Sequence, residues 1–176
     1  MLPPLIRSIS MHYIIAPHGI TDIVHAHVKH NYPRLVQCYA GSVSTAMVLH
    51  ELHLDAIVYA AFFALSVVHF RHDFKRAPWA CSALSLTTFI KMPLDFFFLY
   101  MVLVHVPNHY RTAWPYIKMA KMATAFFVAV TGLWSDAFLF NVVAAHPTCV
   151  ASIVMGHVLY QEGLFFSRNE VPPPFS

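Results

Sequence analysis

Apolar runs of about 20 residues recur along this chain, and a run of that length can cross a hydrocarbon layer about 30 Å thick as an α-helix. No other feature of the sequence constrains the fold as strongly. Only 11% of the 176 residues are charged and 58% are hydrophobic, whereas about a quarter of a soluble domain is charged. The sequence therefore predicts an all-α, polytopic transmembrane bundle of about five to six helices.

Polar turns and prolines divide the apolar runs into separate helices. Proline removes a helical hydrogen bond, so Pro93 is expected to end a short helix and let another begin. Six helices are expected over residues 9–28, 34–50, 56–70, 94–110, 116–134 and 137–166, and 79–92 is expected to form a short additional helix before Pro93. They form a single integral membrane domain over 1–176, in which the polar, proline-rich tail 167–176 is expected to be poorly ordered.

The turns between the first helices alternate in charge. Basic turns follow the first and third helices, and the acidic turn between them holds Glu51 and Asp55, beside His50 and His53, which we interpret as solvated. Basic turns favour the cytoplasmic or matrix-like side of a membrane, so we expect contact with lipids of a cell membrane or mitochondrial inner membrane. The net charge of +3 is small and spread over loops, and it does not indicate a nucleic-acid partner.

Thirteen histidines are many for a membrane protein of this size. Several lie in or beside apolar segments, where a polar side chain without a partner costs several kcal/mol. The ring nitrogens of these histidines must therefore bond to one another, to water, to a carboxylate or to a metal. The three cysteines are scattered without a CxxC spacing, so neither a disulfide framework nor a zinc knuckle is expected.

The segment "PHGITDIVHAHVKH" places His18, Asp22 and His25 on one helix face, because they are four and three residues apart. A carboxylate one turn from an imidazole suits a metal ligand whose other ring nitrogen needs an orienting partner. We interpret His18, near the middle of the expected helix, as a functional residue. We interpret His25, His27 and His30 as interfacial side chains at the helix end.

Two further segments repeat the spacing. In "VVHFRHDF", Asp73 follows His69 by four residues, and this spacing alone leaves open a metal ligand or a histidine that contacts the helix C-terminal carbonyls. In "YMVLVHVPNHYR", His105 and His109 are also four residues apart, as in helices that give two ligands to one ion. Pro107 between them is expected to distort the helix and turn both rings inward.

Other ionisable residues in apolar segments have structural interpretations. Lys91 and Asp95 are one turn apart and are expected to form an ion pair across Pro93. His146 and His157 share one face of the last expected helix but are separated by about 16 Å at 1.5 Å per residue. These two side chains are therefore not expected to share one ion.

Four imidazoles from three helices suit iron, zinc, copper or nickel. An iron with open positions inside an apolar bundle would form an oxygen-activating site. The chain has 15 Phe, 8 Tyr and 8 Met, enough to line an apolar tunnel, although ordinary membrane packing accounts for most of them.

The three segments, in this order, resemble the motifs of one family. "APHGITDI" resembles the PHGxxD signature of the Brp/Blh family of membrane-bound β-carotene 15,15'-dioxygenases. "VVHFRHDF" is similar to the family's HFGxxD segment, and "YMVLVHVPNHYR" to its HSxRH segment. Together these motifs cover roughly a tenth of the chain.

The resemblance implies that a ferrous ion is held by His18, His69, His105 and His109. It also implies that this iron activates O2, which cleaves the central double bond of β-carotene to give two molecules of retinal. Asp22 and Asp73 match the acidic positions that close the first two motifs, and they would orient ligands or support the fold.

The chain also departs from the family. It is shorter between the second and third motifs, Arg71 replaces the glycine of HFG, and Val106 and Asn108 replace the residues between the paired histidines. One alternative is therefore an inactive relative that serves as a structural subunit of a larger membrane complex. A third hypothesis is an electron-transfer subunit with a non-covalent haem, whose axial ligands would be a pair such as His18 and His109.

Overall fold

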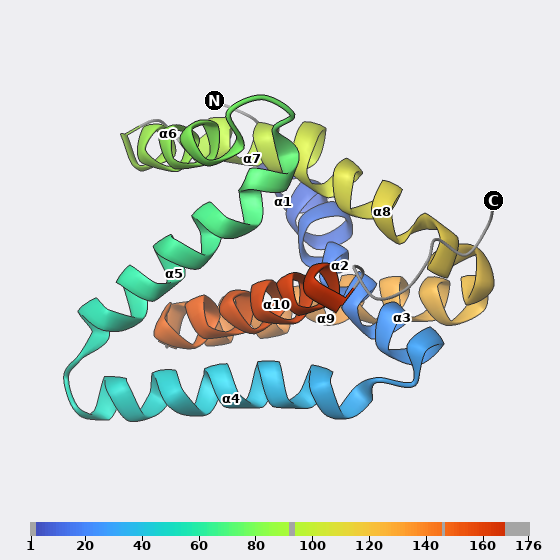
Figure 1. Cartoon of the computed structure of the whole chain (residues 1–176), viewed down its shortest axis with the longest axis horizontal. Coiled ribbons are helices and arrows are strands. Elements are labelled where there is room, and N and C mark those ends of the chain that lie inside the picture. Colours follow the sequence, from blue (N-terminus) through green and yellow to red (C-terminus); the bar gives the residue numbers. More distant parts are fainter. Residues whose placement is uncertain (1–2, 92–93, 146, 168–176) are drawn as a thin grey trace.

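Helices make up nearly all of the computed structural model, which describes residues 3–91, 94–145 and 147–167 (Figure 1). The N-terminal elements are α1 (Pro4–Ser10), the π-helix η1 (Met11–Ile15), α2 (Ala16–His18), α3 (Ile20–Lys29), α4 (Tyr32–Glu51), α5 (Asp55–Phe70) and the 3₁₀-helix η2 (Arg71–Asp73). They are followed by α6 (Pro78–Lys91), α7 (Leu94–Tyr100), the π-helix η3 (Met101–His105), α8 (Val106–Met119), α9 (Lys121–Ala145) and α10 (Pro147–Ser167). The described residues include no strand, so the predicted all-α class is confirmed.

Two expected helix boundaries were wrong. The helix expected to end at residue 110 continues to Met119, and Pro107 is accommodated at the start of α8, directly after the π-helix η3. The break expected near residue 135 is absent, and α9 continues to Ala145. Helix α10 begins at Pro147, whose fixed backbone angle suits the start of a helix. The expected tail lies outside the described residues except for Ser167, the last residue of α10.

Large apolar side chains remain exposed on several helices. They include Val36 and Val48 on α4, Ile57 on α5, and Leu133 and Trp134 on α9. Within the described part of the chain, none of the helices meets both the length and the hydropathy that a membrane crossing requires. The expected transmembrane arrangement stays a prediction.

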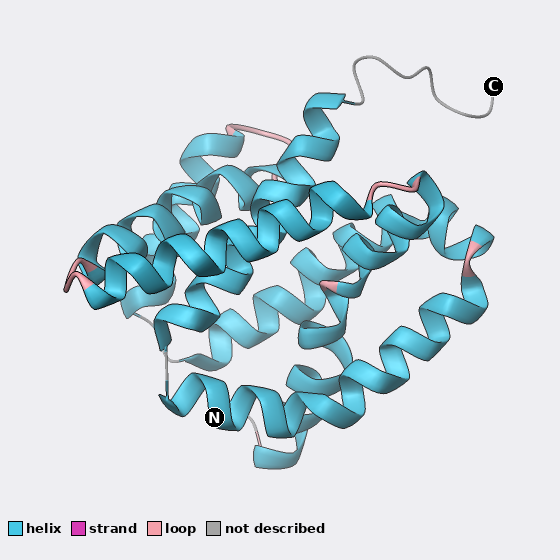
Figure 2. Ribbon diagram, turned by 90° about the horizontal axis from the view of Figure 1, so that it is seen from below, coloured by secondary structure: helices cyan, strands magenta, loops and turns pink. Residues whose placement is uncertain are grey.

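Helix α10 forms the centre of one half of the fold. It packs along α4 and against α5, which diverge from the short turn that joins them (Figure 1; Figure 2 shows the same bundle from below). The side chains of Ala46, Val58, Ala151 and Met155 form the core between these three helices. This packing holds the N-terminal half of α10 against α4 and the N-terminal half of α5.

A second apolar cluster joins elements that are distant in the sequence. Ile15 of η1, Phe70 of α5, Phe98 of α7, Met101 of η3 and Val106 of α8 pack together in this cluster. Burial of this apolar surface brings the end of α5 beside η1 and η3. The expected ligand histidines are located at these same element ends.

The turn between α4 and α5 is fixed by polar contacts at its surface. Asp55 accepts a hydrogen bond from Thr148 at the start of α10, and its Oδ1 lies 2.9 Å from Nδ1 of His50. This hydrogen bond raises the pKa of His50 above its ordinary value. His53 is exposed, as expected, whereas His50 is half-buried and paired rather than simply solvated.

Helices α4 and α10 approach most closely at Gly156. A Cβ at this position would lie 2.9 Å from Tyr39 Cα and 3.2 Å from the Cys38 carbonyl oxygen, both backbone atoms of α4. We expect Gly156→Ala to lower the free energy of unfolding by about 1–3 kcal/mol, because the helices must separate. Denaturant unfolding followed by circular dichroism measures this change.

Gly41 supplies the matched control, since a Cβ there would meet no atom within 4 Å. Gly41→Ala is expected to stabilise the protein by about 0.5–1 kcal/mol, because alanine loses less backbone entropy in a helix. Equal effects of the two substitutions would show that close packing at Gly156 does not contribute to stability.

Candidate metal centre

Five histidine side chains meet in the interior of the bundle. His18 ends α2, His69 lies near the end of α5, His105 ends η3, His109 lies in α8 and His157 lies in α10. Ring centroids of neighbouring members are 4.5–5.5 Å apart. We call these five residues the histidine cluster. The structure therefore brings together all four histidines selected from the sequence and adds one more.

Two π-helices lie directly beside members of the cluster. Helix η1 ends at Ile15, just before the short α2 that carries His18, and η3 ends at His105 itself. A π-turn places one extra residue in a helical turn and so changes the direction of the side chains that follow, and such turns occur often at functional sites. Within one helical run, His105 and His109 have ring centroids only 4.5 Å apart.

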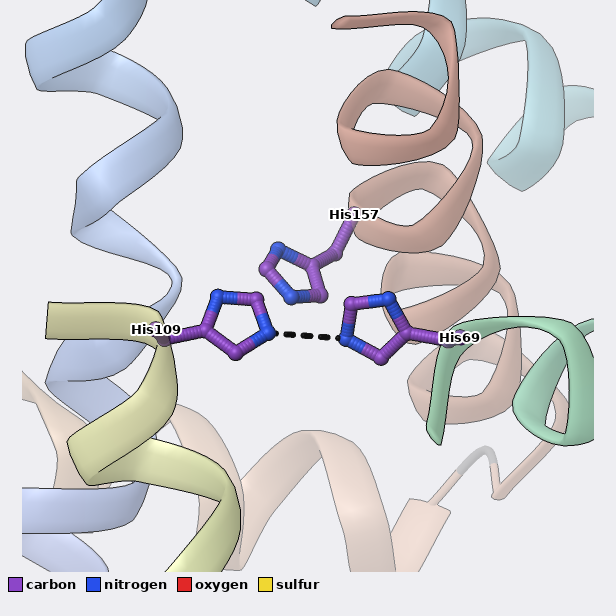
Figure 3. Close-up of side chains that lie close together, drawn as sticks. All are labelled: His69, His109 and His157. Carbon is purple, nitrogen blue, oxygen red and sulfur yellow. Dashed lines mark hydrogen bonds between the residues drawn. The ribbon is translucent and has the colours of Figure 1, made fainter. Parts of the chain in front are cut away.

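Three members of the cluster have donor atoms close enough to share one ion. One ring nitrogen each from His69, His109 and His157 lies within 4.8 Å of the other two, and Figure 3 shows the three rings pointing toward one another. The Nε2 atoms of His69 and His109 are 3.0 Å apart. Two nitrogens that share an ion are separated by roughly 3 Å, because a metal–imidazole bond is about 2.1 Å long.

His157 has a buried ring nitrogen that a metal ion could bind. Its side chain is buried, and its Nε2 has no hydrogen-bond partner among the described residues. Its Nδ1 lies 2.8 Å from Asp22 Oδ2. A buried polar atom without a partner is costly, and a metal bound by Nε2 would satisfy it. The residues present therefore fit a metal ion.

Asp22 is fully buried and accepts hydrogen bonds from three directions. Tyr39 of α4 donates its hydroxyl at 2.7 Å, Gln161 of α10 donates its amide, and the His157 ring is the third partner. Asp22 thus contacts a histidine, but the partner is His157 and not His18 of the same segment. His18 instead has its Nδ1 at the carbonyl oxygen of Ile15.

Asp73 has an equivalent role on the other side of the cluster. Its Oδ2 lies 2.8 Å from His105 Nδ1 and accepts the Tyr100 hydroxyl at 2.6 Å, while Asn108 donates to Oδ1 at 3.0 Å. Asp73 therefore contacts His105 rather than His69, four residues before it. Asn108, one of the departures from the family motif, helps to hold this carboxylate.

Arg71 does not crowd the cluster, although it replaces a glycine of the resembled motif. Its guanidinium donates to Glu162 of α10 at 2.8 Å and lies over the ring of Trp79 at 4.7 Å. Glu162 also lies 3.0 Å from Nε2 of His72. The charge beside His69 is thus compensated within the described structure.

The remaining histidines of the first segment divide into two groups. His27 and His30 are exposed, as expected for residues at a helix end. The expectation for His25 was wrong, because its ring is buried against Tyr116 of α8 at a centroid distance of 4.4 Å. Helix α8 packs along α3 and covers this face.

The expected pair of Lys91 and Asp95 lies partly outside the described residues. Asp95 is buried near the start of α7, and the side chain of Lys91 is among those not described. His146 likewise lies outside the described residues.

His157 was not predicted as a ligand from the sequence. The only histidine compared with it was His146, on the same expected helix but too far away to share an ion. The available signal was the group of polar residues that His157 forms with Gln161 and Glu162 inside an otherwise apolar segment. All three side chains are buried, and all three contact or face residues of the candidate site.

Two cavities of opposite character lie near the cluster. The smaller has a volume of about 60 Å³ and a lining of mostly polar side chains. They include His69, His105, Asn108, His109 and Thr112. The larger is an apolar groove of about 560 Å³ between α4, α5 and α10, with a lining that includes Ala46, Leu49, Val58, Leu65, Met155 and Leu159. Leu65 lies one turn before His69 on α5, so the groove reaches close to the cluster along that helix.

The arrangement has the chemical character of a first-row transition-metal site. Imidazole donors converge on one point, and buried carboxylates contact the outer nitrogens of two of them. Comparison of the chain with protein-family models, with curated proteins and with solved structures found no match.

Proposed function

We propose that this protein is a membrane-bound, iron-dependent dioxygenase. Its proposed substrate is β-carotene or a related apolar carotenoid, cleaved at the central double bond to give retinal. The observation that carries the proposal is that the rings of His18, His69, His105 and His109 lie in one buried cluster, with centroids of neighbouring rings 4.5–5.5 Å apart. Three short segments far apart in the sequence supply them, and the resemblance selects these four residues.

The donor set supports iron as the metal. Imidazole nitrogen suits iron among several first-row metals, and a ferrous ion bound there would supply activation of O2. The ion would be held by ligands drawn from the four predicted histidines and His157. Asp22 and Asp73 would fix the ring orientations of His157 and His105 through Nδ1.

The apolar groove supports an apolar substrate. A ligand pocket is typically lined by apolar side chains with a few polar groups that fix orientation, and the groove between α4, α5 and α10 has this composition beside a cluster of polar groups. The apolar side chains exposed on α4, α5 and α9 support a location in the membrane, since large exposed apolar patches are typical of membrane contact. Whether this membrane is a cell membrane or a mitochondrial inner membrane stays a prediction.

Metal analysis combined with a cleavage assay tests the proposal. We expect the protein to remain in carbonate-washed membranes and, after purification in detergent, to carry close to one iron per chain. With β-carotene, air and a reductant to keep iron ferrous, it should form retinal, detected by liquid chromatography. Retinal formation should cease without oxygen or after treatment with an iron chelator, and should return when ferrous iron is added.

The alternatives predict different results. A structural subunit would contain no iron and would copurify with other membrane proteins. A haem-binding subunit would show a Soret absorption band, but the cavity beside the cluster is about 60 Å³, which leaves little room for a porphyrin in this conformation. Iron-free protein that is correctly folded would exclude the dioxygenase.

A further inference from the structure

The outer nitrogen of His69 differs from those of His105 and His157. Its Nδ1 is buried and has no hydrogen-bond partner among the described residues. A carboxylate oxygen, Oε1 of Glu162, lies 3.9 Å away, beyond hydrogen-bond distance. Both side chains are buried, with 5% and 8% of their surfaces exposed. A small rotation of either side chain would bring the two atoms into contact.

A histidine that binds a metal through Nε2 carries a proton on Nδ1 and needs an acceptor for it. A carboxylate in this position fixes the ring and increases the basicity of the ligand nitrogen. Asp73 and Asp22 already lie 2.8 Å from Nδ1 of His105 and His157. Nε2 of His69 faces His109 within the cluster, so its Nδ1 points toward Glu162 on the outside.

We propose that Glu162 is the positioning residue for His69. Its carboxylate accepts a hydrogen bond from Nδ1 of His69 when a metal occupies the histidine cluster. This inference rests on the proposed metal site. Arg71 and His72 hold the carboxylate in place at 2.8 and 3.0 Å. Both lie in η2, directly after the helix that carries His69. One short segment thus provides a metal ligand and the two groups that fix its partner on α10.

A purely structural role for Glu162 predicts a different mutational pattern. If Glu162 only neutralised Arg71, then removing both side chains together would leave the site intact. If Glu162 positions His69, then the loss persists in the double variant, because the acceptor for Nδ1 is still missing. The double substitution therefore separates the two roles.

The experiment measures Co²⁺ binding to the purified, metal-free full chain in detergent, with cobalt as a spectroscopic probe. We expect Glu162→Leu and the double variant Arg71→Leu/Glu162→Leu to bind Co²⁺ about 10–100-fold more weakly than the unaltered chain. Their visible absorption bands should also shift, because the ring of His69 is no longer fixed. Glu162→Gln, which keeps an acceptor oxygen, should recover part of the affinity. Asp55→Asn, which changes a carboxylate that pairs with His50 in the α4–α5 turn, should keep full affinity.

The results distinguish this inference from the proposed function. Unchanged cobalt affinity and spectra in all Glu162 variants would overturn the role of Glu162 and leave the metal site intact. Restored affinity in the double variant alone would also overturn it, in favour of simple charge neutralisation. Absence of cobalt and iron binding by the unaltered, folded chain would overturn both. Circular dichroism of the metal-free variants verifies that each has folded.

Discussion

Replacing His157 by alanine is expected to remove bound iron as completely as replacing His69. The variant should keep less than about a tenth of the metal of the unaltered chain, a loss in the range found when supporting residues of metal sites are changed. The ring nitrogens of His69, His109 and His157 are the three within 4.8 Å of one another. His157 also has a buried Nε2 without a hydrogen-bond partner and an orienting contact with Asp22. Elemental mass spectrometry of the purified variants measures the loss.

His53→Ala and His27→Ala are the matched controls, because both imidazoles are exposed and lie outside the cluster. They should retain the full metal content. His157→Gln keeps most of the side-chain volume and separates loss of a ligand from loss of packing. If His157→Ala kept all its iron while His69→Ala lost it, His157 would be a structural residue and the metal would be held by the other histidines.

Replacing Asp22 by alanine is expected to cause the largest loss of stability, about 3–5 kcal/mol, the usual cost of breaking a buried polar network around a charged group. Tyr39, Gln161 and His157 would each lose an acceptor in a site that excludes water. Asp22 also links α3 to both α4 and α10 through these contacts. Denaturant unfolding of the metal-free protein measures the change, so that loss of metal does not contribute.

Asp55→Ala gives the comparison for a more exposed carboxylate. Asp55 also has two side-chain partners, His50 and Thr148, but its side chain is 37% exposed. Water can replace its contacts, so the expected loss is below about 1 kcal/mol. Equal losses for the two substitutions would mean that Asp22 is not the central connection between these helices.

Helical spacing selected residues that the structure brings together, but it did not predict the partners of the two carboxylates. The four-residue spacing placed Asp22 with His18 and Asp73 with His69. The structure instead pairs Asp22 with His157 and Asp73 with His105. Spacing shows which side chains share a helix face, whereas the partner of a buried carboxylate depends on which other helix covers that face.

The helical class and most helix positions could be predicted because apolar runs and prolines mark them locally. The end of α9 could not, since the polar residues near position 135 resemble a turn but lie within a continuous helix. His157 was missed for a related reason. Eleven residues separate it from His146, too many for the two to share an ion on one expected helix, and the packing of α10 against α4 and α5 brings it to the other four.

The contact between Asp22 and His157 joins residues 135 positions apart in the chain. During synthesis, His18, His69, His105 and His109 all emerge from the ribosome before α10 is made. Until α10 arrives, Asp22 lacks two of its partners and His69 lacks the carboxylate that faces it. Long-range contacts of this kind form only after the entropy of closing a large loop has been overcome. The candidate site therefore cannot be complete until α10 has docked. A fully assembled site shows that this docking has taken place.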